Sequence, residues 1–323
     1  MLLNTNEDYR IEQTDCIPHM MEDMPADSVD MSIFSPPFPA LYAYTSKPED
    51  IGNSENLTTE APLHLGFFYS GLVRVMKPGR VVIVHVMQIR RLKRSGMEGT
   101  FDFRGLNIRL AQRAGFIYET DIPITKNPQS QAIRTRCRSL QFAGLEADRA
   151  SSFPAFNDYL IKLRAPGENA TPICTGPTET REVSREEWIR WAEGVWTWHD
   201  IKQTDVLNVK EGRGKDDTKH ICPLQLGVID RCVRLWSNPG EVVFSAFAGI
   251  GSEGYQAILN GRRFYGCEIK AEYHKTAVMN MQRAQQKRQH AQQGLFADEP
   301  TPKQAVSDLQ PPASGLTKRK ATG

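Results

Sequence analysis

The chain has 323 residues, of which 40% are hydrophobic and 24% charged, so it is long enough to bury one large core or two modest ones. Forty Lys and Arg residues against 38 Asp and Glu residues give a net charge of +2, which argues against a protein that binds its partner by bulk positive charge. No apolar run approaches the roughly 18 residues of a membrane span, and the N-terminus lacks the basic-then-apolar order of a secretion signal. We therefore expect a cytoplasmic protein with no membrane partner.

The six cysteines are scattered without a C-x-x-C pair, which favours reduced thiols over a disulfide framework or a zinc cluster. His220 and Cys222 have the residue types that would begin a metal site, but no second half follows them. We therefore expect no metal.

The first half of the chain alternates helix and strand signals. An apolar strand is predicted over residues 29–34, and the prolines that follow it must lie just past its C-terminal end, because proline cannot continue a strand ladder. The other elements predicted here are a helix over 63–76, a turn at 77–79, a strand buried on both faces over 81–86, a helix over 107–114, and strands near 116–122 and 159–163. The alternation predicts an α/β fold with a mainly parallel sheet.

The second half begins with a polar, turn-rich region over residues 167–219, whose tryptophans at 188, 191, 196 and 198 are more typical of a core than of base stacking. A helix is predicted over 226–236, a strand over 241–244, a helix over 253–259 and a strand over 263–268. Beyond residue 283 the composition is that of a disordered tail. These signals divide the chain into residues 1–165, a variable insert over 166–219, a second half of the same domain over 220–283 and the tail (284–323).

A glycine-rich loop, F-A-G-I-G-S-E-G at residues 247–254, lies between a predicted strand and helix. Closely spaced glycines there let a ligand approach the backbone, and Glu268, about 20 residues on, can accept hydrogen bonds from ribose hydroxyls. Glu253 at the start of the helix would repel the phosphates of NAD. S-adenosylmethionine, which has a ribose, an adenine and a sulfonium but no phosphate, fits these residues better than NAD does. The alternative is that the glycine loop is a structural turn with no ligand.

A second motif, Ser35-Pro36-Pro37-Phe38, follows the first strand. The rigid diproline fixes carbonyls that, with the Ser35 hydroxyl, can accept hydrogen bonds from an exocyclic amino group, and Phe38 offers a face for stacking a base. Such acceptors favour a pyramidal nitrogen whose lone pair points at a methyl donor, which stabilises the transition state. A strand terminated by proline, with no catalytic role, is the alternative.

Taken together, these motifs resemble the amino-directed DNA methyltransferases of the N4-cytosine/N6-adenine group, in the permuted order that places the SPPF box before the F-x-G-x-G loop. The resemblance rests on D-C at 15–16, S-V-D at 28–30, the box at 35–38, K-P-G-R at 77–80, H-I-C-P-L-Q at 220–225, N-P-G at 238–240, the glycine loop and G-R-R-F-Y-G-C-E at 261–268.

The resemblance implies a Rossmann-like, S-adenosylmethionine-dependent methyltransferase fold. In such a fold residues 1–165 would be the catalytic half, 166–219 an insert for target recognition and 220–283 the donor-binding half of the same domain. It implies that the donor is contacted by Phe247, Gly249, Gly251 and Glu268, with Asp15 near its adenine and the segment that begins at His220 closing over its amino-acid end. One departure is Ser245-Ala246, where the family usually has Asp-Pro. That change removes one carboxylate contact to the donor.

Contacts to DNA are predicted for a basic stretch that contains Lys126, Arg134, Arg136 and Arg138. The alternating arginines would share one side of an extended segment but spread around a helix. A solvated charged face is the alternative. We expect target recognition between residues 126 and 219.

The activity implied is transfer of a methyl group to the exocyclic nitrogen of a flipped adenine or cytosine in DNA, as in restriction-modification systems. Ser35 at the first box position is commoner among cytosine-directed relatives, which slightly favours cytosine. The alternatives are an RNA or protein amide methyltransferase and a non-catalytic nucleic-acid-binding protein. The sequence leaves open whether the protein is a homodimer.

Overall fold

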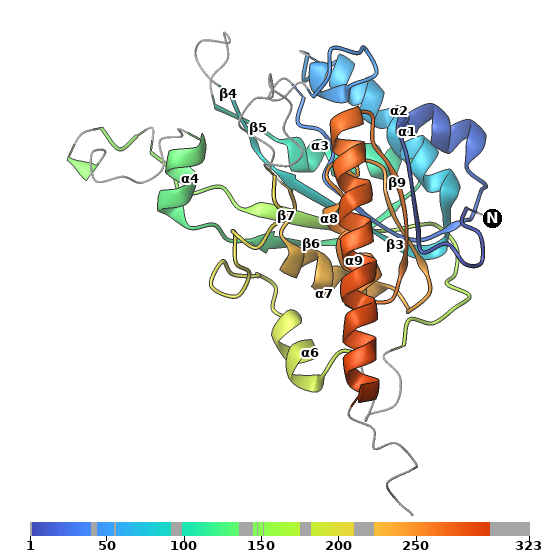
Figure 1. Cartoon of the computed structure of the whole chain (residues 1–323). Coiled ribbons are helices and arrows are strands. Elements are labelled where there is room, and N and C mark those ends of the chain that lie inside the picture. The colour runs from blue at the N-terminus through green and yellow to red at the C-terminus, as the bar shows by residue number, and fades with distance from the viewer. Residues whose placement is uncertain are drawn as a thin grey trace, which may run out of the picture.

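The computed structural model describes residues 2–39, 44–54, 56–91, 99–135, 145–146, 148–150, 152–174, 182–209 and 223–297. Its centre is a seven-stranded sheet with helices on both faces (Figure 1). The strands, in spatial order, are β1 (Tyr9–Glu12), β9 (Arg263–Cys267), β8 (Val242–Ser245), β2 (Val29–Phe34), β3 (Met76–Met87), β7 (Asp158–Arg164) and β6 (Ile117–Ile124). In this sheet β7 runs antiparallel to both neighbours and the remaining pairs are parallel, which confirms the mainly parallel α/β prediction.

The helical elements follow the expected local signals. Asp102 caps α3 by accepting a hydrogen bond from the Gly105 amide at 2.9 Å, and Gly115 ends that helix at φ 109°. The helices and helical turns are α1 (Cys16–Pro18), the π-turn η1 (His19–Asp23), the 3₁₀ turn η2 (Ile51–Asn53), α2 (Glu60–Val75), α3 (Phe103–Ala114), α4 (Pro128–Thr135), α6 (Arg185–Trp191), α7 (Leu226–Trp236), α8 (Ser252–Leu259) and α9 (Ala271–Ala297). A small separate sheet pairs β4 (Ile89–Arg91) with β5 (Gly99–Phe101). Within the described part of the chain, no helix combines the length and hydropathy of a bilayer span.

The central strand β3 is buried on both faces, as its apolar sequence predicts. Val82 and Val84 pack into the core beneath α2 and α3, whereas Val81 and Ile83 pack into the core beneath α7, α8 and α9. Figure 1 shows α9 lying along the sheet on this second side. Each such side chain contributes about 1.5–3 kcal/mol when fully buried, so β3 anchors both layers.

Two predicted features, the turn at residues 77–79 and the start of the disordered tail, were wrong. The turn expected at residues 77–79 lies within β3. Met76 of β3 pairs with Val29 of β2, and pairing resumes where Val81 meets Met31. The residues between Met76 and Val81 form an irregularity in the register. The tail predicted to begin at residue 284 is helical through Ala297, since α9 continues to that point. Residues 298–323 lie outside the described residues.

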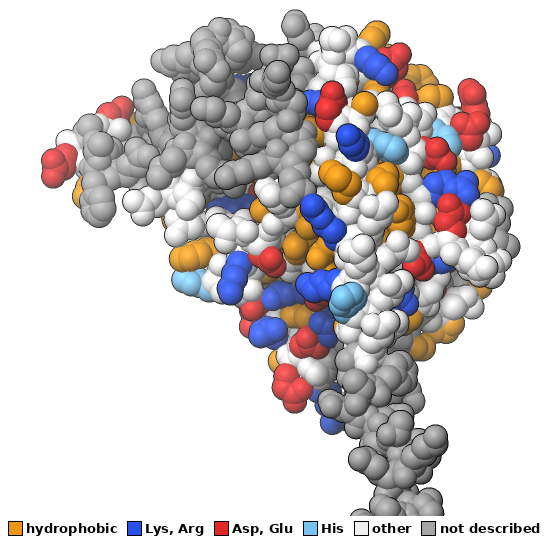
Figure 2. Space-filling view, viewed as in Figure 1, with side chains coloured by type: hydrophobic (Ala, Val, Ile, Leu, Met, Phe, Trp, Pro, Cys, Tyr) orange, Lys and Arg blue, Asp and Glu red, His pale blue; other side chains and the backbone are white. Residues whose placement is uncertain are grey.

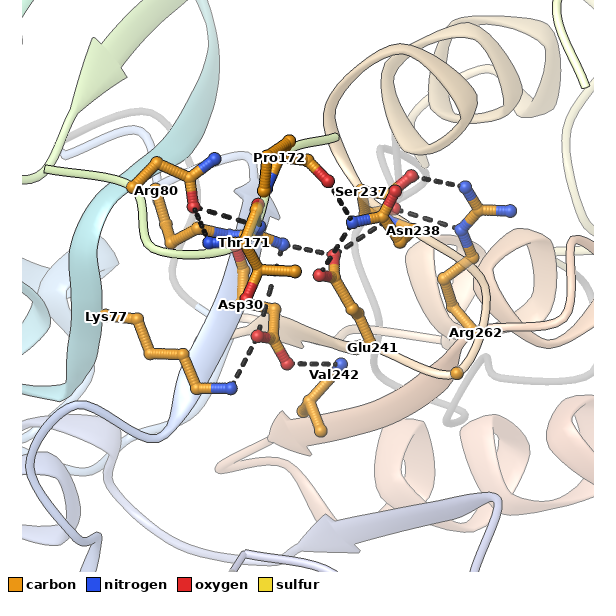
Figure 3. Close-up of polar contacts among 12 residues, drawn as sticks. Asp30, Lys77, Arg80, Thr171, Pro172, Ser237, Asn238, Glu241, Val242 and Arg262 are labelled. Carbon is orange, nitrogen blue, oxygen red and sulfur yellow. Dashed lines mark hydrogen bonds and ion pairs between the residues drawn. The ribbon is translucent and has the colours of Figure 1, made fainter. Parts of the chain in front are cut away.

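The N-terminal ends of three central strands are joined by a buried charged cluster (Figure 3). The Arg80 side chain is 2% exposed, donates from Nε to the Asp30 carbonyl at 2.7 Å and forms an ion pair with Glu241. The Asp30 carboxylate accepts from the Val242 amide at 2.9 Å and pairs with Lys77. Because each buried charge has a partner, the cluster joins β2, β3 and β8 at the sheet edge opposite their C-terminal ends.

Candidate active site

A cavity opens at the C-terminal edge of the sheet, where β8 and β2 are neighbours. The chain connections run in opposite directions from this point. Helix α8 connects β8 to β9 over one face of the sheet, and α2 connects β2 to β3 over the other face. Such a switch point is where open α/β sheets bind their ligands. The cavity is lined by residues that follow β1, β2, β8 and β9, so both predicted motifs contribute to it.

The charge of the cavity wall is negative. Its carboxylates are Asp15, Glu49, Asp50, Glu253 and Glu268, and the wall contains no Lys or Arg among the described residues. A phosphate group would be repelled here, whereas a sulfonium or ammonium group would be attracted. The wall therefore has the charge that a cationic ligand without phosphate requires.

Glu268 directly follows β9 and lines the cavity, and its contact with a ribose stays a prediction. Its carboxylate accepts hydrogen bonds from the Gly249 amide at 2.7 Å and the Lys270 amide at 2.8 Å, which fixes it at the end of β9. Burial raises the pKa of Glu268 from 4.5 to about 7, although the two backbone hydrogen bonds oppose this rise. The group is thus held in place and titrates near neutral pH.

The two central glycines of the loop have different surroundings. Gly249 has φ +54° and lines the cavity, and an added Cβ there would meet no other atom within 4 Å. Gly251 has φ +85° and caps α8, and an added Cβ would lie 2.8 Å from Met281 Cε and 3.2 Å from the Ala277 Cα. Gly251 does not line the cavity and lies where α8 packs against α9, so its contact with the donor stays a prediction.

Two further polar groups at the start of α8 face the cavity. Burial raises the pKa of Glu253 to about 8, and the nearby Glu268 carboxylate adds to that rise. The Ser252 Oγ is buried and has no hydrogen-bond partner within the described part of the chain. A bound ligand with polar groups would satisfy this hydroxyl. With the acidic wall, these groups fit S-adenosylmethionine.

Of the three other residues predicted to bind the donor, two line the cavity. Asp15 lines the cavity while it caps α1 through a hydrogen bond from the Ile17 amide at 3.0 Å, and burial raises its pKa. Phe247 also lines the cavity, with its ring 4.9 Å from that of Phe68 in the core. His220 lies outside the described residues.

Sequence reasoning missed the acids that precede α2. Asp50 is buried at the cavity wall, and its carboxylate accepts hydrogen bonds from the amides of Tyr44, Thr45 and Gly52 at 2.7–2.9 Å. Glu49 lines the cavity beside it. The signal was an acidic pair between the SPPF box and the next helix, but nothing local distinguishes such a pair from a surface turn.

The SPPF box is described in full, and its members face different ways. Ser35 and Pro37 line the cavity, whereas Pro36 and Phe38 do not. The Phe38 ring is partly buried, with its centroid 5.4 Å from that of Phe103. Ser35 and Pro37 therefore share one cavity with the glycine loop, and stacking of a base on Phe38 stays a prediction.

A row of hydrogen-bonded side chains leads away from Ser35. The Ser35 Oγ lies 2.7 Å from His85 Nδ1, and His85 Nε2 lies 2.9 Å from Asp158 Oδ2. Lys126 forms an ion pair with the same carboxylate. Burial alone would raise the pKa of Asp158, but the positive charge of Lys126 and the contact with His85 lower it to about 2. Sequence reasoning missed both His85 and Asp158.

The predicted DNA-contacting residues are only partly visible. Lys126 is nearly buried in its ion pair with Asp158, a position that does not suit a phosphate contact. Arg134 lies in α4 rather than in an extended segment, so the expected alternation of arginines on one side does not begin there. Arg136 and Arg138 lie outside the described residues. Their contact with phosphate stays a prediction.

The surface around α6 and α7 carries both signs of charge. Figure 2 shows Lys and Arg side chains interspersed with Asp and Glu side chains on this face. Two arginines of α7 form ion pairs, Arg231 with Asp200 and Arg234 with Glu187. Among the predicted core tryptophans, those at 191 and 196 are buried, whereas that at 188 is 58% exposed. Among the residues that Figure 2 colours, neither positive nor negative charge dominates this face. The pattern is therefore not typical of a phosphate-binding surface.

The fold and the cavity define a Rossmann-like, S-adenosylmethionine-dependent methyltransferase. A family model described as DNA methylase, for N6 and N4 methyltransferases, matches residues 29–279. The chain therefore belongs to the N6/N4 DNA methylase family.

Individual relatives agree with this assignment. The chain is 33% identical over 79 residues to the type II methyltransferase M1.MboII of Moraxella bovis, a match that covers 24% of this chain and 29% of that protein. It thus matches less than a third of that relative's length. Two solved structures share the fold: TTHA0409 from Thermus thermophilus in complex with S-adenosyl-L-methionine (TM-score 0.61, 20% identity, 85% of this chain and 95% of that one) and the cytosine-N4-specific PvuII DNA methyltransferase (TM-score 0.60, 16% identity, 85% and 87%).

Proposed function

We propose that this protein transfers a methyl group from S-adenosylmethionine to the exocyclic amino group of cytosine or adenine in DNA. The observation that carries this proposal is a shared cavity: Ser35 and Pro37 of the SPPF box line the same cavity as Gly249 and Glu268. A direct transfer requires the amino nitrogen and the methyl donor to lie in line within one water-poor space. Family membership supplies DNA as the substrate class.

The residues divide into two roles. Glu268 would bind the ribose hydroxyls of the donor, and the acidic wall would attract its positively charged groups. When bound, S-adenosylmethionine supplies the methyl group on a sulfonium that leaves as a neutral thioether. Ser35 would accept a hydrogen bond from the target amino group, which orients the nitrogen lone pair toward the methyl carbon. Because this contact strengthens as the nitrogen becomes positive, it favours the transition state.

The test offers unmethylated DNA, RNA and a mixture of peptides to the purified protein with isotopically labelled S-adenosylmethionine. We expect label in DNA, and we expect mass spectrometry of the digested nucleosides to find N4-methylcytosine, because the box begins with serine. N6-methyladenine would correct the choice of base. Label in RNA or peptide alone, or label in none of the three, would refute the proposed substrate.

The matched variants are Ser35→Ala and Ser54→Ala. Ser54 also has its hydroxyl beside a histidine, with Oγ 3.1 Å from His64 Nδ1, but it does not line the cavity. Ser35→Ala should slow methylation while donor binding is retained, and Ser54→Ala should leave the rate unchanged. Equal rates in the two variants would remove Ser35 from the site.

A further inference from the structure

The row of side chains that begins at Ser35 and ends at Lys126 crosses four neighbouring strands of the sheet. Ser35 follows β2, His85 lies near the end of β3, Asp158 begins β7 and Lys126 follows β6, and these strands are adjacent in that order. The register pairs Phe34 with Val84, and Ile124 with Asp158. The row therefore crosses the sheet along its C-terminal edge, and Ser35 is its member at the cavity wall.

The direction of the hydrogen bonds follows from the charges. Asp158 is ionised and can only accept, so His85 Nε2 carries a proton and donates it to Oδ2. Lys126 already neutralises the Asp158 carboxylate, and a second buried cation at His85, which is 9% exposed, would be unfavourable. The resting imidazole is therefore neutral, and its bare Nδ1 accepts the proton of the Ser35 hydroxyl. The free lone pair of Ser35 Oγ is left for the cavity.

We propose that His85 is the residue that positions Ser35 as a hydrogen-bond acceptor and that receives, through Ser35, the proton lost by the target amino group. The inference rests on the proposed methyl transfer. The nitrogen lone pair forms the new bond to the methyl carbon, and the electron pair of the broken carbon–sulfur bond stays on sulfur. The nitrogen then gives one proton to Ser35 Oγ as the Ser35 proton moves to His85 Nδ1. The products are a neutral methylamino group, an intact serine and an imidazolium that faces Asp158.

The decisive variants are His85→Ala and His85→Asn. The Asn side chain retains an acceptor near the position of Nδ1 but cannot take up the proton. His64→Asn is the control, because His64 also lies beside a serine hydroxyl but belongs to α2, outside the cavity. Single-turnover methylation of unmethylated DNA is measured, and S-adenosylmethionine binding is measured by calorimetry on the same preparations.

We expect His85→Ala to slow transfer by roughly 10²- to 10⁴-fold with donor affinity unchanged. His85→Asn should recover part of this rate, while His64→Asn should match the parent in both rate and donor affinity. A parent rate in both His85 variants would overturn the proposal and leave the row as structural packing.

A spectroscopic measurement reads the same geometry without activity. Long-range NMR correlations of ¹⁵N-labelled histidine report which ring nitrogen carries the proton, and we expect the Nε2–H form at His85 in the folded protein at neutral pH. The Ser35→Ala variant should shift the Nδ1 signal. An imidazolium or an Nδ1–H tautomer would refute the proposal even if DNA is methylated, whereas a parent protein that methylates no DNA would refute the proposed function.

Discussion

The affinity for S-adenosylmethionine should depend on Glu268 and on pH. Glu268→Ala removes the acceptor for the ribose hydroxyls and also leaves the Gly249 and Lys270 amides without their partner. Loss of charge-assisted hydrogen bonds costs about 1–3 kcal/mol, which corresponds to a dissociation constant roughly 5- to 150-fold larger. Glu268→Gln retains an uncharged acceptor and should show a smaller loss.

The pH dependence follows from the raised pKa. Burial penalises the ionised form of Glu268 and moves its pKa from 4.5 to about 7, which corresponds to a penalty of about 3 kcal/mol on the charged state. Since the carboxylate is the better acceptor, donor binding should strengthen as pH rises through about 7. Once Glu268 is fully ionised, its contribution to the affinity should stay constant. The same shift means that the free energy of unfolding falls between pH 4.5 and about 7, because the folded protein holds this proton longer than the unfolded chain.

Calorimetric titration with S-adenosylmethionine over this pH range checks the affinity, and urea unfolding over the same range checks the free energy of unfolding. Glu268→Gln should flatten the rise in affinity near pH 7, whereas Glu253→Gln should retain it, because the pKa of Glu253 lies near 8. Glu12→Gln is the matched control, since Glu12 ends the neighbouring strand β1 but does not line the cavity. An affinity that is unchanged in Glu268→Ala would remove this residue from the donor site.

Three other variants test the fold and the target pocket. Glu241→Ala leaves the buried Arg80 guanidinium with only its longer ion pair to Asp30, at 4.0 Å, and should lower the free energy of unfolding in urea by up to about 3–5 kcal/mol. An unchanged midpoint would show that solvent reaches Arg80. Gly251→Ala forces φ +85° on alanine and a contact with Met281, so the same assay should show a loss of about 1–3 kcal/mol, and no loss would mean that the loop relaxes. Phe38→Ala should weaken DNA binding by about 1–3 kcal/mol with donor binding unchanged, and parent DNA affinity would make Phe38 a core residue only.

The central sheet was predictable because its signals are local. The strand expected at residues 29–34 is β2, and the double proline after it places Ser35 and Pro37 at the cavity. The helix expected over 107–114 ends at Gly115, although it begins earlier, at Phe103. Apolar runs and glycine or proline stops act over a few residues, so the sequence carries them directly.

The helix α9 was missed because its stability comes from tertiary contacts. Tyr273, Ala277, Met281 and Ala284 are buried at helical spacing, but they stand among Gln, Lys and Arg residues whose composition suggested disorder beyond residue 283. In the fold, Met281 and Ala277 pack against the turn at Gly251. A polar helix with a narrow apolar stripe becomes predictable only when the surface that covers the stripe is known.

The row from Ser35 to Lys126 depends on a feature that no local pattern contains. His85 sits within a valine-rich strand, and Lys126 begins a basic stretch, so each was interpreted from its neighbours. An all-parallel sheet would place Asp158, at the start of its strand, at the edge opposite Ser35 and His85. Because β7 runs antiparallel to β3, its start lies at the C-terminal edge instead, where Asp158 meets both His85 and Lys126. The reversal of this one strand therefore brings a buried carboxylate to the end of the sheet that holds the cavity, and the hydrogen-bond partner of Ser35 is fixed by topology rather than by sequence.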